Sequence, residues 1–154
     1  MYHFTDGGLR NVWLRNGYTI RSTPYGKTIS FEDVDGLTKT ICIALTEKQG
    51  KLTGAEFRYL RLHMLMSQKA LGQLLGYTEQ AVAKWEKSGK IPKAIDLIVR
   101  RIFIEKNSGN TKINSVINTL NLIERVASTR IILSEKQRKW KADFAEDDQE
   151  LEAA

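Results

Sequence analysis

The chain has 154 residues, of which 42% are hydrophobic and 27% charged, and its formal net charge is +6. This composition supports a globular core and excludes wholesale disorder, and the length suits one domain with a smaller attachment. A single cysteine excludes an internal disulfide, and with only two histidines it also excludes the usual four-ligand zinc site. No apolar run approaches the roughly 18 residues of a membrane helix, so we expect a soluble, cytoplasmic protein with no membrane partner.

Residues 1–50 are predicted to form a small β/α module. Aromatic and β-branched residues indicate strands over 11–14, 18–23 and 27–31. Asn16-Gly17 separates the first two strands and suits a tight hairpin turn, and Pro24-Tyr25-Gly26 is a second turn signal. Apolar residues at helical spacing then predict a helix over 34–47. So small a module is not stable alone, so we expect it to pack on the rest of the chain or on a partner.

From residue 51 onward the signals are helical, and they predict a mainly α protein. The residues that can cap or open helices are Thr53 (with Glu56 in a capping-box pattern), Ser67, Thr78 and Pro92. Gly76 suits the left-handed end of the second of these helices, and Ser88-Gly89 ends the third. The fourth helix continues to about residue 105.

A fifth helix is predicted from an apolar stripe formed by Ile113, Val116, Ile117, Leu120 and Ile123. The stripe either closes a five-helix core or serves as a dimer face. Residues 51–133 would then form a repressor-like helix-turn-helix domain with additional helices.

Residues 134–154 form a charged tail with 4 basic and 7 acidic side chains, a net charge of −3. We expect this tail to be a helix that carries Trp140 and Phe144, or to be disordered until bound. It could also fold over the basic part of the chain as a polyanion mimic.

Two short helices joined by a tight turn at Gly76 make the helix-turn-helix arrangement. The apolar seam between them is assigned to Leu71, Leu75, Val82 and Trp85, and Gly72 lies where the two helices cross closely. The outer face of the second helix then carries Glu79, Gln80, Ala81 and Lys84, with Ala83 at its edge. That face has the size and polarity to enter a DNA major groove. Residues 53–104 hold 9 basic and 4 acidic side chains, an excess of +5 that favours a polyanionic partner.

The segment SQKALGQLLGYTEQAVAKWEKSGKIP, residues 67–92, resembles the helix-turn-helix of phage-repressor/Cro-like (XRE family) DNA-binding domains. Gln68, Gly76, Thr78, Val82, Trp85 and Glu86 stand where that family places recurrent residues. The resemblance covers about residues 53–104. Gly72 departs from it mildly, because Ala is more usual there.

The resemblance implies roles for the matching residues. Bases would be contacted by Thr78, Glu79, Gln80 and Lys84, and phosphates by Gln68, Lys87, Ser88 and Lys90. Gln80 suits adenine, Lys84 suits guanine, and Glu79 suits the amino group of cytosine. Glu79 could instead favour the helix start or repel phosphates, and the lysines at 87 and 90 could be ordinary solvated side chains. Arg61 and Glu86 stand at positions that pair in this family.

The sequence gives no sign of an enzyme. It lacks a glycine-rich phosphate loop and a nucleophile motif, and Asp33 and Asp35 fit charges at a helix start better than a metal site. We therefore expect no catalytic residue, no metal ligand and no cofactor.

Three functions remain open. The first is a sequence-specific transcriptional repressor that binds double-stranded DNA as a homodimer. The second is an antitoxin that autorepresses its operon and neutralises a toxin through residues 1–50 or the acidic tail. The order of segments is similar to MqsA-type antitoxins, although the paired zinc-binding cysteines of that family are missing. The third is an interaction protein that keeps the motif only as a scaffold.

Overall fold

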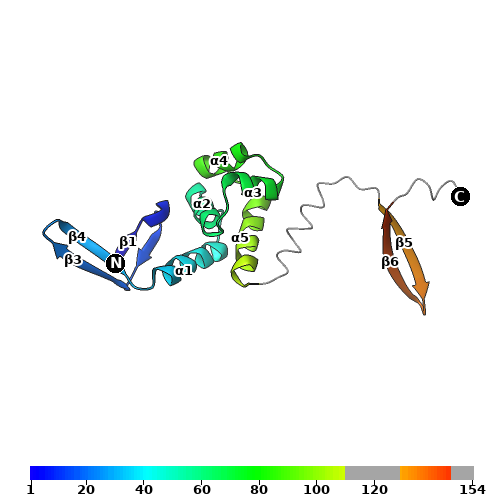
Figure 1. The fold of residues 1–154 in the computed structure, drawn as a ribbon, viewed down its shortest axis with the longest axis horizontal. Coiled ribbons are helices and arrows are strands. Elements are labelled where there is room, and N and C mark those ends of the chain that lie inside the picture. The colour runs from blue at the N-terminus through cyan, green and yellow to red at the C-terminus, as the bar shows by residue number, and fades with distance from the viewer. Residues whose placement is uncertain (110–128, 147–154) are drawn as a thin grey trace. The chain divides into compact units, whose positions relative to one another are not determined.

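The computed structural model describes residues 1–109 and 129–146, and the chain divides into two compact units, Met1–Asn118 and Thr119–Ala154. Each unit is described by itself. None of the described helices is both long enough and apolar enough to cross a membrane. The fold is drawn in Figure 1.

The first unit opens with two antiparallel strand pairs. β1 (Tyr2–Phe4) pairs with β2 (Val12–Leu14), and the short 3-10 helix η1 (Asp6–Gly8) lies between them in the chain. β3 (Tyr18–Thr23) pairs with β4 (Gly26–Phe31) across the turn at Pro24-Tyr25.

The predicted hairpin turn at Asn16-Gly17 is wrong, because residues 12–14 pair with β1 and not with β3. This pairing turns Phe4 into the core, where it is 3% exposed, and stacks the His3 ring on Trp13 with centroids 4.1 Å apart. Gly17 instead closes the base of the second pair, where its carbonyl accepts the Glu32 N–H at 2.9 Å. The remaining turn and strand predictions of this module are confirmed.

Five described α-helices follow, the first where the apolar spacing predicts it and the other four where the capping residues predict them. They are α1 (Val34–Glu47), α2 (Gly54–His63), α3 (Gln68–Leu75), α4 (Glu79–Ser88) and α5 (Lys93–Asn107). The capping box at Thr53 and Glu56 is complete, with both reciprocal hydrogen bonds formed. Asp33 caps α1 from a left-handed conformation, with its side chain accepting the Gly36 N–H at 3.1 Å.

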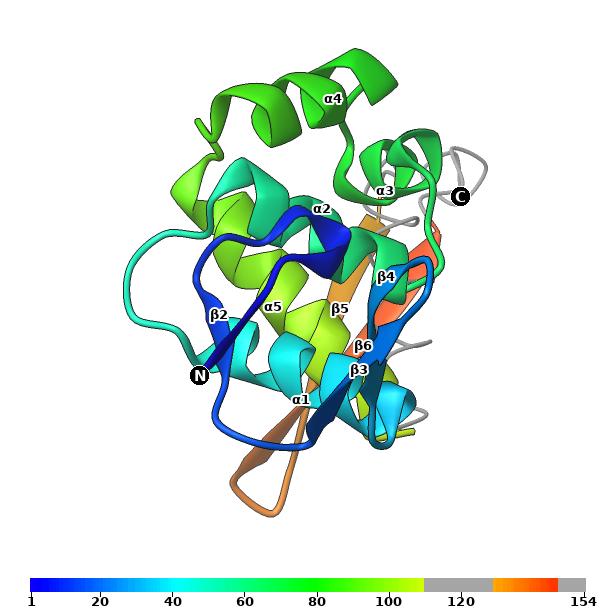
Figure 2. The same cartoon turned by 90° about the vertical axis from the view of Figure 1, so that its left-hand side faces the viewer.

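One apolar core joins the N-terminal strands to the helices. Its fully buried members include Leu9 after η1, Cys42 on α1, Leu60 on α2 and Val99 on α5. The η1 turn lies directly on α2, as Figure 2 shows. Residues 1–50 therefore pack on the helices of their own chain.

The described part of the second unit is a β-hairpin, β5 (Thr129–Lys136) with β6 (Lys139–Glu146). The prediction of a helical or disordered tail is wrong for residues 134–146. The residues of its turn explain why the hairpin could not be predicted from the sequence. Gln137 and Arg138 both have positive φ, 53° and 61°, as a two-residue type I′ turn requires, but neither is the glycine or asparagine that normally signals one.

Two predictions concern residues outside the described ones. The stripe from Ile113 to Ile123 and the last residues of the acidic tail, 147–154, both fall there. Because strands open and close the described chain, a mainly α class is not confirmed for the protein as a whole.

Candidate DNA-binding surface

Local signals fix α3 and α4 and the turn between them. The Ser67 hydroxyl accepts the Ala70 N–H at 3.0 Å, and the Thr78 hydroxyl accepts the Ala81 N–H at 3.1 Å. Gly76 ends α3 with φ 77°, a left-handed conformation that other residues adopt at a cost. The bounds of both helices are therefore set by local capping residues.

The seam between α3 and α4 is apolar and close-packed. Leu71 and Val82 are fully buried, and the Trp85 ring meets Tyr77 edge-on with centroids 4.8 Å apart. A Cβ atom at Gly72 would lie 2.9 Å from the Tyr77 carbonyl oxygen. Glycine at this position therefore allows the turn to come so close, which explains the departure from alanine.

The outer face of α4 is exposed. Thr78, Glu79, Gln80 and Lys84, the four residues predicted to contact bases, are all exposed and follow one another along this face. No partner within the described residues holds the side chains of Glu79, Gln80 or Lys84. The hydroxyl oxygen of Thr78 is occupied as the helix cap, but its hydrogen stays available to a ligand. The face thus offers hydrogen-bond donors and acceptors that form no bond to the part of the chain that the structure describes.

A buried polar cluster fixes α4 against α2 and α3. The guanidinium group of Arg61 contacts the Glu86 carboxylate at 2.8 Å, with side chains only 7% and 5% exposed. The same carboxylate accepts the side-chain amide of Gln68 at 3.1 Å. Arg61 also donates to the Met66 carbonyl at 2.9 Å. The pair that the resemblance implies is therefore present, and Gln68 ties the start of α3 to it.

Three of the four residues predicted to contact phosphate, Lys87, Ser88 and Lys90, lie at the end of α4. Lys87 and Lys90 are exposed. The Ser88 hydroxyl donates to the Lys84 carbonyl at 2.8 Å and accepts the Lys90 N–H at 3.2 Å, so it shapes the turn and would have to give up its own bond to meet a phosphate. Gln68 is half-buried at the first position of α3, with its amide directed to Glu86.

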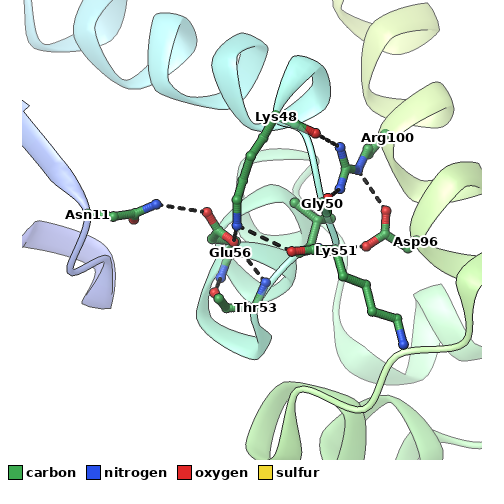
Figure 3. A network of polar contacts seen from close by, with 9 residues as sticks. Asn11, Lys48, Gly50, Lys51, Thr53, Glu56, Asp96 and Arg100 are labelled. Atoms are coloured by element: carbon green, nitrogen blue, oxygen red, sulfur yellow. Dashed lines mark hydrogen bonds and ion pairs between the residues drawn. The ribbon is translucent and has the colours of Figure 1, made fainter.

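A second polar network, which sequence reasoning missed, holds the connection between α1 and α2 (Figure 3). Glu56, 1% exposed, accepts from the Lys48 ammonium at 2.6 Å, the Thr53 N–H at 2.8 Å and the Asn11 amide at 3.2 Å. Burial raises the pKa of the Glu56 carboxyl, but these partners outweigh it and hold the pKa below its ordinary value.

The other half of this network is centred on α5. Asp96 accepts the buried Leu52 N–H at 2.7 Å and the Arg100 guanidinium at 2.7 Å. Arg100 also donates to the carbonyls of Lys48 and Gly50 (Figure 3). The i,i+4 spacing of Asp96 and Arg100 was a visible signal, whereas their contacts with a loop some 50 positions away were not.

The groups that could carry other chemistry are inert or dispersed. Burial raises the pKa of the Cys42 thiol to about 12 and that of the Tyr59 hydroxyl to about 12, so neither is ionised at neutral pH. In the parts of the chain that the structure describes, no group of three or more His, Cys, Asp or Glu side chains could hold a metal ion.

Residues 57–98, from α2 to the middle of α5, match a family model described as a helix-turn-helix. The match spans a little over a quarter of the chain and contains the whole of α3 and α4. This segment is therefore a helix-turn-helix of the phage-repressor/Cro-like type, and the chain is a DNA-binding regulator in the general sense. Neither a curated protein nor a solved structure matches the chain.

Proposed function

We propose that the protein is a sequence-specific transcriptional regulator, acting as a repressor, which reads double-stranded DNA with the outer face of α4. The observation that carries this proposal is the combination of a free polar face with a fixed helix. Glu79, Gln80 and Lys84 have no partner within the described residues, while Arg61 and Glu86 hold the other side of the motif. A side chain on a fixed helix loses less freedom on binding than one on a mobile loop.

Each outer-face side chain is assigned to the base that its chemistry suits. Gln80 can donate to and accept from adenine, Lys84 can donate to the two acceptors of guanine, and Glu79 can accept from cytosine. Lys87 and Lys90 neutralise phosphates of the DNA backbone. Gln68, at the start of α3, donates its second amide hydrogen to another phosphate of the DNA.

The direct test measures the affinity of Gln80→Ala and Lys84→Ala for a cognate duplex and for duplexes changed at single base pairs. Each variant should lose about 1–3 kcal/mol of binding free energy on the cognate duplex, and it should lose the preference for a particular base at one base pair only. Lys27→Ala, a change of an exposed lysine on β4, is the control. An equal loss on every duplex would assign the two residues to phosphate instead.

We further propose that the protein binds as a homodimer, because one such domain makes few base contacts and two half-sites multiply them. The predicted stripe from Ile113 to Ile123 is one candidate interface. The described residues offer another on β5–β6, whose one face carries exposed apolar side chains: Ile131, Leu133, Trp140 and Phe144, between 61% and 73% exposed. A two-stranded ribbon is marginal alone, so a second copy of this face would stabilise it.

Sedimentation of the full chain at micromolar concentration tests the dimer. Trp140→Lys should lower the dimer fraction strongly, whereas Lys141→Ala on the opposite face should not. A wild-type monomer at this concentration would remove the dimer, and unchanged dimerisation of the Trp140 variant would assign it to another surface.

An antitoxin is the second candidate function, and the β3–β4 ribbon favours it. Residues 19–30 are exposed throughout, and each of the two strands pairs only with the other among the described residues. Free strand edges of this kind accept a strand from a partner protein. Co-expression with the product of the adjacent gene tests this function, since a stable complex lost on deleting 18–31 would support it and free protein alone would count against it.

A further inference from the structure

A groove in the first unit joins the end of α4 to the loop that follows η1. It has a volume of about 690 Å³, and the residues that line it include Arg10, Asn11, Thr53, Gly54, Lys87 and Ser88. We call it the loop groove. Two of these residues, Lys87 and Ser88, are ones predicted to contact phosphate, so the N-terminal module lies next to the proposed DNA surface.

The charge exposed along the loop groove is positive. Arg10 and Lys87 are exposed, and the one acidic lining residue, Glu86, is 5% exposed and engaged with Arg61 and Gln68. Lys90 follows within the same turn and is exposed as well. An anionic ligand along this groove would therefore meet cations with no exposed carboxylate among the lining residues.

The chain on both sides of Arg10 is anchored. Leu9 is 1% exposed in the core, and the Asn11 amide donates to Glu56 at 3.2 Å. The Arg10 carbonyl lies 2.7 Å from the Nε2 atom of His3. The turn before it is pressed on α2 so closely that a Cβ atom at Gly7 would lie 2.5 Å from the Tyr59 ring.

The side chain of Arg10 itself has no partner within the described residues. Because the backbone at Arg10 is already held in place, binding has to order only its side chain, and the planar guanidinium group can bind an oxyanion with two parallel hydrogen bonds.

We propose that the loop groove is a second DNA contact, in which Arg10 and Lys87 together bind phosphates of the strand that flanks the bases read by α4. This inference rests on the proposed DNA-binding function and gives the N-terminal module a role in it. The contact is with the sugar–phosphate backbone, so it raises the affinity for every duplex and carries no sequence preference.

The test compares Arg10→Ala with Arg15→Ala in the full chain, on the cognate duplex and on a scrambled duplex. Arg15 is the matched control, since it is an exposed arginine of the same module that does not line the groove. Arg10→Ala should weaken binding to both duplexes by the same factor and reduce the magnitude of the slope of log affinity against log salt by about two, because each subunit of the proposed dimer loses one phosphate contact. Arg10→Glu should weaken binding further, and Arg15→Ala should change neither quantity.

Two results would overturn the contact. The first is that Arg10→Ala leaves affinity and salt slope unchanged, as Arg15→Ala does. The second is that Arg10→Ala weakens binding to the cognate duplex alone, which would make Arg10 a base contact. Gln80→Ala measured in parallel separates this inference from the proposed function. If that variant loses specificity while Arg10→Ala does nothing, only the loop groove is wrong. If wild-type protein binds no duplex, the proposed function fails together with this inference.

Discussion

At the residue scale, the buried pair of Arg61 and Glu86 holds the helix that we propose to contact DNA. It orients α4 through side chains that are almost fully enclosed. The net stabilisation from such a pair can be near zero, because both charges lose their hydration, but removing one partner leaves the other charge buried and unpaired.

Arg61→Ala should therefore lower the free energy of unfolding by about 3–5 kcal/mol. Arg58→Ala, a change of an exposed arginine on the same helix, should alter it by less than about 0.5 kcal/mol. Urea denaturation of the two variants checks this. Similar small losses in both would mean that the pair does not orient the motif.

Glu56 makes the stability depend on pH. Its pKa is lower in the folded chain than its ordinary value near 4.3, so its contribution is present above that pH and is lost as pH falls through the folded value. Glu56→Gln should destabilise the protein at pH 7 by about 1–3 kcal/mol, with a smaller difference from wild type at pH 3. Thermal unfolding at both pH values measures this.

Glu47→Gln, a change of an exposed carboxylate at the end of α1, is the control for Glu56→Gln and should show no such trend. A difference between wild type and the Glu56 variant that is the same at both pH values would contradict the role given to this carboxylate.

At the element scale, the start of α2 lies against the end of α4 even more closely than Gly72 lies against the turn after α3. A Cβ atom at Gly54 would lie 2.0 Å from the Glu86 carbonyl oxygen. Helix propensity alone predicts that Gly54→Ala stabilises the protein by up to about 1 kcal/mol. The close contact predicts instead that Gly54→Ala lowers the free energy of unfolding by about 1–3 kcal/mol or more. Denaturant titration of this variant distinguishes the two predictions.

The elements also show how far the sequence could be interpreted. Helices α2 to α5 were predictable because caps such as Thr53 and Thr78 act within one turn of the chain. The face of α4 followed from the same local pattern. The strand pairing of the N-terminal module was not predictable, because burial of Phe4 and the stacking of His3 on Trp13 depend on residues far from Asn16-Gly17. Arg10 carried no signal at all, since only the packing of η1 on α2 brings it to the groove.

At the scale of the whole molecule, binding should depend strongly on salt. The three exposed cations proposed to contact phosphate, Arg10, Lys87 and Lys90, would make about six phosphate contacts in the proposed dimer. The slope of log affinity against log salt should then be about −5, which lowers affinity roughly 10³-fold between 50 and 200 mM salt. A slope near −3 would indicate that a single subunit binds.

The central claim is that the free polar face of α4 reads base sequence, and a random-oligonucleotide selection with wild-type protein and the Gln80→Ala/Lys84→Ala variant tests it most directly. Wild-type protein should enrich a motif with two-fold symmetry, and the variant should retain DNA without enriching that motif. Recovery of the same motif by both proteins, or of no motif by wild type, would contradict the account.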